Sequence, residues 1–240
     1  MSKKQKQFCI IAQARSGSTL LRHALNAHPQ LSCHGEVLSR KWINGLIPID
    51  NPSIDRSPKP VVEELMKGRD GDIASFLNEH VLAIDSPCVG FKIVYEDLYK
   101  SDTSEVIIDY LISNNIPIIH LVRLNPLRAY VSLLRMSQFG VTHSDSHKKG
   151  EQSDSIELDI QKFLAYKIKQ GEYQKLTNSL FKRQIVTQIN YENIEEGYNM
   201  AIEGLGLPAH RMEKKLARVG VVDMSKYVSN YSEVNEFDSP

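Results

Sequence analysis

Three stretches of the chain consist almost entirely of apolar residues, and each is short enough to form one strand. They span residues 8–12, 89–94 and 116–122, and a fourth candidate strand, residues 184–192, is rich in β-branched residues. The first three are continuously apolar, which is typical of parallel strands that are buried on both faces. Helical periodicity occupies the segments 18–27, 104–114, 126–138 and 195–205. This alternation predicts an α/β protein with three layers, α/β/α, around a central and mainly parallel sheet.

Polar segments separate these elements. Residues 44–60 are rich in Pro, Asn and Asp and are expected to form a loop. Residues 142–156 are expected to be mobile, either as a lid or substrate wall of an enzyme or as a disordered segment. We expect one domain over residues 1–240, with flexible ends at 1–6 and 236–240.

Composition excludes several classes of protein. The 240 residues are 41% apolar, and the 29 basic residues equal the 29 acidic ones, so no overall charge attracts nucleic acid. No apolar run is long enough to cross a membrane, and the apolar stretch near the N-terminus is too short for a signal peptide. The three scattered cysteines fit a reducing compartment. We therefore expect a cytoplasmic protein without a transmembrane segment.

The segment "FCIIAQARSGSTLL" is a strand, a turn of small residues and the start of a helix. It follows the Walker pattern G-x-x-x-x-G-K-[ST] at Gly17 and Thr19, whereas Ala12 replaces the first glycine and Ser18 replaces the lysine. Backbone N–H groups at such a helix start bind anions, and Arg15 adds a fixed positive charge. The segment therefore predicts an anion site that lacks the lysine of a nucleoside triphosphate site, or else a strand–turn–helix with incidental Ser and Gly.

The apolar strand "IPIIHLV" ends at Arg123, where a Walker site would hold magnesium with an aspartate. An arginine at this strand end indicates a second contact to an anion. Ser132, nine residues later on the next helix, could reach the same anion. We expect no metal: His143, Asp145 and His147 lie close in sequence but have no further ligand nearby.

Taken together, "ARSGSTLL", "VGFKI" and "HLVRLNPLRAYVS" resemble the sulfotransferases that use 3′-phosphoadenosine-5′-phosphosulfate (PAPS), in the bacterial branch that includes the nodulation-factor type. The resemblance runs from about residue 8 to residue 231. It implies a P-loop-like sheet, PAPS as sulfuryl donor, and a 3′-phosphate held by Arg123 and Ser132. The residues implied to hold the 5′-phosphosulfate are Arg15, Ser16, Gly17, Ser18, Thr19 and Leu20.

This chain departs from the cytosolic animal enzymes of that family in two ways. Arg15 stands where those enzymes carry a lysine, which favours the bacterial and carbohydrate branch. Their Arg-Lys-Gly stretch on the 3′-phosphate is missing, and the nearest basic candidates here are Lys214, Lys215 and Arg218.

The candidates for catalysis lie in two further segments. Lys92 interrupts an apolar strand, so it either points into a site beside Arg15 or snorkels to solvent from an edge strand. In "LSCHGEVLS", the resemblance implies that Glu36 is the base, because the glutamate of a Gly-Glu pair at this place is the base in that branch. His34 is the alternative base, with an ordinary pKa closer to neutrality. A third interpretation is that Glu36 only caps a helix.

We therefore predict a sulfotransferase that acts on a hydroxyl group of a carbohydrate or glycolipid. The alternatives are a P-loop kinase for a small molecule and a catalytically inactive nucleotide-binding module. The sequence carries no pattern that identifies the acceptor molecule or the oligomeric state.

Overall fold

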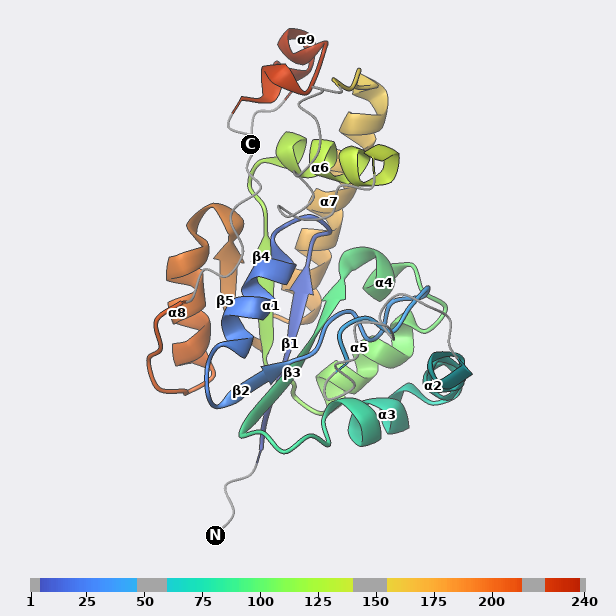
Figure 1. Cartoon of the computed structure of the whole chain (residues 1–240), viewed down its shortest axis with the longest axis vertical. Coiled ribbons are helices and arrows are strands. Elements are labelled where there is room, and N and C mark those ends of the chain that lie inside the picture. The colour runs from blue at the N-terminus through green and yellow to red at the C-terminus, as the bar shows by residue number, and fades with distance from the viewer. Residues whose placement is uncertain (1–4, 47–59, 140–154, 213–222, 238–240) are drawn as a thin grey trace.

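The computed structural model describes residues 5–46, 60–139, 155–212 and 223–237 (Figure 1). In this part of the chain, five parallel strands form one sheet in the order β2-β3-β1-β4-β5. The strands are β1 (Lys6–Ala12), β2 (Leu31–Cys33), β3 (Cys88–Val94), β4 (Ile118–Val122) and β5 (Ile185–Asn190). The expected parallel sheet is confirmed.

Strand β1 lies at the centre of the sheet and is buried on both sides. Its residues Phe8 and Ile10 face one core, and Cys9 and Ile11 face the other. All four side chains are fully buried. A strand buried on both faces needs apolar residues at every position, which explains the unbroken run in the sequence.

Helices cover both faces of the sheet, as the α/β/α expectation requires (Figure 1). One face is covered by α1 (Ser18–Asn26) and α8 (Ile194–Gly204). The other is covered by α3 (Ile73–Phe76), the π-helical turn Leu77–Val81, α5 (Ser104–Ser113) and part of α7 (Ile160–Leu180). The remaining helices are α2 (Pro60–Gly71), α4 (Tyr95–Tyr99), α6 (Pro126–Phe139) and α9 (Tyr231–Asn235), with 3-10 turns at Tyr191–Asn193 and Met224–Lys226.

A third, smaller core joins α6 and the start of α7 to the C-terminal segment, above the carboxyl ends of the strands in Figure 1. Phe163 and Val228 are buried in it. The side chain of Asn230 donates to the carbonyl of Leu158 and accepts from its N–H, both at 2.9 Å. These contacts fasten the C-terminal segment against α6, whose residues border the site described below.

The structure differs from the sequence-based expectations in several places. Strand β2 and helices α2, α4 and α7 were not expected. The ordered chain also begins earlier: Lys6 belongs to β1, and the Gln5 side chain donates to the carbonyls of Ile84 and Ser86. The predicted loop at 44–60 and the predicted mobile segment at 142–156 lie almost wholly outside the described residues. Among the described helices, none is long and apolar enough to cross a membrane.

Candidate active site

The site lies where the carboxyl ends of β3, β1 and β4 meet the helices that follow them. After β1 the chain first adds β2 and β3 on one side and later β4 and β5 on the other. Ligands of open α/β sheets bind beside such a switch in strand order, at the carboxyl ends of the strands. The loop between β1 and α1, residues 13–17, lies at this point.

This loop folds back on itself just before the start of α1. Arg15 and Gly17 both have a positive φ, 63° and 82°. The Ser16 hydroxyl donates to the Gln13 carbonyl at 2.6 Å, and the Ser16 N–H donates to the same oxygen. Ser16 is fully buried and stabilises the loop from inside, so both of its donors are already used. Helix α1 has no side-chain cap and no acidic residue in its first turn, which leaves an N-terminus suited to an anion.

Gly17 has no room for a side chain. A Cβ atom there would lie 2.3 Å from Cε2 of Tyr191, which follows β5 directly. The positive φ is a second reason for glycine at this position, because residues with a Cβ atom rarely adopt that backbone conformation. The sequence suggested that Gly17 serves a bound ligand, whereas the structure shows that it also accommodates the Tyr191 ring.

Arg15 connects the loop to α6. Its Nε donates to Ser132 Oγ at 3.1 Å, and Nη1 of Arg123 donates to the Arg15 carbonyl at 2.9 Å. The sequence expected Arg123 and Ser132 to converge, and the structure brings both of them to Arg15. Burial lowers the pKa of the Arg15 guanidinium, and the Glu36 carboxylate opposes this effect. Glu36 is therefore close enough for its charge to act on Arg15.

Arg123 follows β4 directly and is largely buried, which lowers its pKa. Its guanidinium lies 4.7 Å from the centre of the Tyr191 ring. Its Nε is buried and has no hydrogen-bond partner among the described residues. Glu192 is satisfied elsewhere, since its carboxylate accepts from the N–H groups of Leu124 and Asn125 at the start of α6. Arg123 therefore keeps one buried donor that has no hydrogen-bond partner in the described structure.

Lys92 and Glu36 form an ion pair at the start of α1. Lys92 Nζ lies 2.8 Å from Glu36 Oε1 and donates to Thr19 Oγ1 at 3.4 Å. The Lys92 side chain is 5% exposed, and β3 lies between β2 and β1. A lysine that snorkels from an edge strand to solvent is therefore excluded, and Lys92 points toward the α1 side of the sheet.

The segment after β2 continues alongside β3 and presents Glu36. The His34 N–H donates to the Gly90 carbonyl, and the Lys92 N–H donates to the Gly35 carbonyl. The Glu36 side chain is 27% exposed, whereas His34 is fully buried. Burial lowers the pKa of His34 to about 4. A substrate can therefore reach Glu36 but not His34, so the geometry favours Glu36 as a base.

Sequence reasoning missed Arg22, one turn after Thr19 on α1. Its Nη1 packs against Gly35 and Gly45, and a Cβ atom on Gly45 would lie 1.9 Å from it. The i, i+3 spacing from Thr19 on one helix face was the available signal. Arg22 thus lies against the segment that carries Glu36, with its guanidinium beside both glycines.

The other predicted residues lie at different distances from this cluster. Ser18 is buried at the first position of α1, and Leu20 is half-buried and packs against the core beneath α1. Lys214, Lys215 and Arg218 lie outside the described residues, as do His143, Asp145 and His147. Within the described ranges, no group of three or more potential metal ligands occurs.

Comparisons with known proteins give a weak similarity in fold. No family model matches the chain, and no curated protein matches it. The fold is similar to that of a sulfotransferase from Alicyclobacillus acidocaldarius, at 14% identity over 97% of this chain and 91% of that one, with a TM-score of 0.47. A similarity this low carries no argument about activity.

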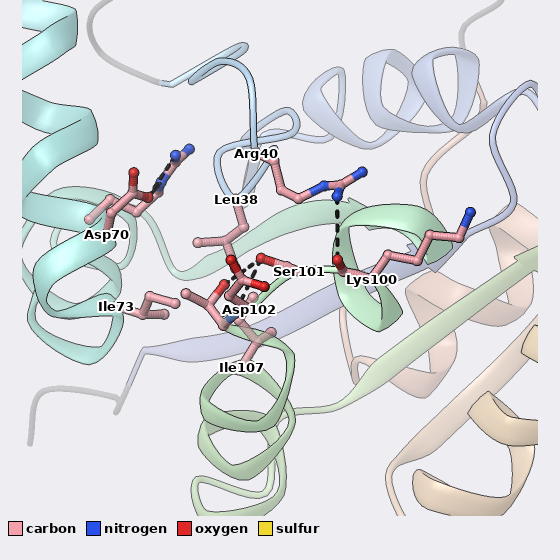
Figure 2. Close-up of a pocket in the computed structure, with 10 residues that line it drawn as sticks. Leu38, Arg40, Asp70, Ile73, Lys100, Ser101, Asp102 and Ile107 are labelled. Carbon is pink, nitrogen blue, oxygen red and sulfur yellow. Dashed lines mark hydrogen bonds and ion pairs between the residues drawn. The ribbon is translucent and has the colours of Figure 1, made fainter.

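A pocket of about 380 Å³ lies next to the segment that carries Glu36 (Figure 2). Leu38 and Arg40 come from that segment and line one side. Ile107 of α5 and Asp102, which precedes that helix, line another. The Arg40 side chain donates to the Lys100 carbonyl at 3.3 Å, shown dashed in Figure 2. The pocket combines apolar walls with charged groups of both signs.

The described part of the site therefore contains two adjoining groups of functional side chains. Arg123 and Ser132 contact Arg15 on the β4 side. Lys92, Thr19 and the Glu36 carboxylate meet on the β3 side. The first group can hold an anion, and the second combines positive charge with a reachable base.

Proposed function

We propose that this protein transfers a sulfuryl group from PAPS to an acceptor hydroxyl, and that the acceptor is a carbohydrate or glycolipid. The observation that carries the proposal is the contact between Lys92 and Glu36 at the uncapped start of α1. It puts a cation and a carboxylate together where an anionic donor would bind. The sequence motifs around Arg15, Lys92 and Arg123 support the same chemistry.

The residues present fit such a donor. The uncapped start of α1 and Arg15 suit a 5′-phosphosulfate. The buried Nε of Arg123, which has no partner in the described structure, suits the 3′-phosphate. Ser132 is linked to Arg123 by Arg15, which donates to Ser132 and accepts from Arg123. When bound, the donor supplies an activated sulfuryl group. Arg123 and Arg15 bind and orient it with charge-assisted hydrogen bonds.

Each side chain of the second group has a distinct task in this proposal. Glu36 accepts the proton of the acceptor hydroxyl, whose oxygen forms the new bond to sulfur. Lys92 and Arg15 stabilise the negative charge that develops on the leaving oxygen as the old bond to sulfur breaks. Thr19 accepts a hydrogen bond from Lys92 Nζ and so helps to fix its position.

The main competing function is that of a small-molecule kinase. It requires a lysine at the position of Ser18 and a carboxylate for magnesium at the strand end, where Arg123 stands. An inactive nucleotide-binding module is the other alternative, and it gives no reason for Glu36 to face Lys92 in a reachable position.

One binding experiment separates these functions. We expect adenosine 3′,5′-bisphosphate to raise the melting temperature in the absence of magnesium, and ATP with magnesium to do so weakly or not at all. Stronger stabilisation by ATP with magnesium would favour the kinase.

A transfer assay then tests the activity itself. Radiolabelled PAPS is offered with panels of saccharides, glycolipids and phenols, and we expect label to appear on a saccharide or glycolipid. Binding of the bisphosphate without transfer to any panel would favour the inactive module.

A further inference from the structure

The loop that follows Glu36 is held together by one buried side chain. We call residues 36–44 the base loop. Nη1 of Arg69, in the last turn of α2, donates to the carbonyls of Val37, Ser39 and Trp42 at 3.3, 2.7 and 3.2 Å. Arg69 is 3% exposed. A single guanidinium thus binds three carbonyls of the loop just after Glu36.

The charge of Arg69 is compensated where it lies. Asp70 accepts from Arg69 Nε and forms an ion pair with Nη2, both at 2.8 Å. Asp70 itself is 60% exposed, so the three loop carbonyls are the buried partners of this charge. Figure 2 shows Asp70 on one wall of the pocket, with Leu38 and Arg40 of the base loop on another. A buried charge with this many hydrogen bonds resists displacement.

The base loop has two further sets of attachments. The Glu36 carbonyl accepts from the N–H groups of Ser39 and Asn44 at 3.3 and 3.4 Å. Asp97 of α4 accepts from the Arg40 N–H, in the middle of the loop, at 3.3 Å. Arg69 differs from both in that a single buried side chain binds three carbonyls of the loop.

We propose that Arg69 is a positioning residue that holds the base loop so that Glu36 stays against Lys92. The proposal rests on the proposed function, because it assigns Arg69 to the same reaction. Lysine cannot replace it, since a single ammonium group cannot serve the loop carbonyls and Asp70 with the same planar array of donors. Without Arg69 the carbonyls lose their partner, and the loop is expected to move and carry Glu36 away from Lys92.

A merely structural role, in which Arg69 only docks α2, is the competing explanation. Helix α2 has its own apolar contacts, because Val62 is buried and Leu65 and Met66 pack against the main core. We therefore expect α2 to stay docked, and the chain to stay folded, when Arg69 is replaced.

The test compares Arg69→Ala and Arg69→Lys with Arg183→Ala, which replaces an exposed arginine far along the chain. Trp42 is the only tryptophan in the sequence and its carbonyl is bound by Arg69, so its fluorescence reports on the loop directly. We expect acrylamide to quench Trp42 more strongly in both Arg69 variants, and the amides of Ser39 and Asn44 to exchange faster with deuterium. The Arg183 control should leave both signals unchanged.

Kinetics complete the test. We expect kcat of Arg69→Ala to fall about 10- to 100-fold, as for a displaced catalytic group, with KM for PAPS unchanged. Dilute guanidinium ion should partly restore kcat to Arg69→Ala but not to Arg69→Lys, because only the alanine variant leaves space for it.

The outcomes separate the two proposals. If the unaltered protein showed no transfer activity, the proposed function would be refuted. Trp42 fluorescence and amide exchange would still show whether Arg69 holds the loop. Unchanged Trp42 quenching and amide exchange would overturn the role of Arg69 whatever the activity. A rise in KM for PAPS as large as the fall in kcat would also overturn it, because the donor site would then have been damaged.

Discussion

Two buried histidines make the folded protein sensitive to mild acid. His120 of β4 is fully buried; its Nδ1 lies 2.8 Å from Asn178 Oδ1, and its Nε2 lies within hydrogen-bond distance of the Tyr95 hydroxyl. If Nδ1–H donates to Asn178, Nε2 accepts from Tyr95, and no site remains for a second proton without reorganising the contact. Burial lowers the pKa of His120 to about 4, and that of His34 likewise to about 4.

The sign of the pH dependence follows from the pH at which the folded and the unfolded state each take up the proton. The unfolded chain takes up a proton near pH 6.5, whereas the folded chain takes it up only near pH 4, so acidification over this interval favours unfolding. For each histidine, the loss of unfolding free energy between pH 7.5 and pH 5 amounts to about 2 kcal/mol. Both together remove roughly 4 kcal/mol, a large part of the 5–15 kcal/mol typical of a domain.

The assay is urea unfolding of the unaltered protein and of His120→Gln at several values between pH 5 and pH 7.5. Glutamine can still accept a hydrogen bond near Tyr95 but does not titrate. We expect its unfolding free energy to fall by about 2 kcal/mol less than that of the parent over this range. The control is His80→Gln, which changes an exposed histidine and should keep the parental slope. Parallel curves for parent and His120→Gln would refute the assignment of the pH dependence to a buried neutral His120.

Three further predictions concern the site. Glu36→Gln should lower turnover roughly 10²- to 10⁴-fold while calorimetry shows unchanged affinity for adenosine 3′,5′-bisphosphate; retained turnover would contradict its role as base. Arg123→Ala should weaken that bisphosphate much more than adenosine 5′-monophosphate in the same titration, and equal losses would remove Arg123 from the 3′-phosphate. Gly17→Ala should lower the unfolding free energy by roughly 2–5 kcal/mol in urea, because its Cβ would collide with Tyr191 at a positive φ; a neutral effect would mean that the ring moves aside.

Strands β1, β3 and β4 were predictable because burial on both faces imposes a pattern that needs no knowledge of the partner strands. Strand β1 is an example, with every residue from Phe8 to Ala12 fully buried. Strand β2 has only three residues, too few for any pattern to show. Its pairing with β3 comes from tertiary contacts that a local reading does not contain.

Helix α7 was missed for a different reason. Two of its buried residues, Gln170 and Thr177, are polar, and two of its apolar residues, Ile168 and Leu176, are exposed. The helix therefore has no apolar stripe in the sequence. Its polar residues instead contact α4: the Gln170 side chain donates to Glu96, and the Thr177 hydroxyl lies 2.6 Å from the Tyr99 hydroxyl. Tertiary hydrogen bonds replace the hydrophobic face on which sequence reasoning depends.

The residues of the site also divide into those that the sequence reveals and those that it does not. Arg15, Lys92 and Arg123 stand out because each is a cation at or inside an apolar strand or tight turn. Arg69 carries no such signal, since an arginine near a helix end is usually a solvated surface residue. Its partners are carbonyl groups about 30 positions away, and backbone carbonyls have no signature in a sequence.

The central position of β1 has a consequence for synthesis on the ribosome. Its first neighbour in the sheet, β3, emerges about 80 positions later, and its second neighbour, β4, more than 100 positions later. At ordinary translation speeds the apolar segment "FCIIA" waits for at least several seconds without either partner. Nascent chains of this protein should therefore recruit holdase chaperones early in elongation.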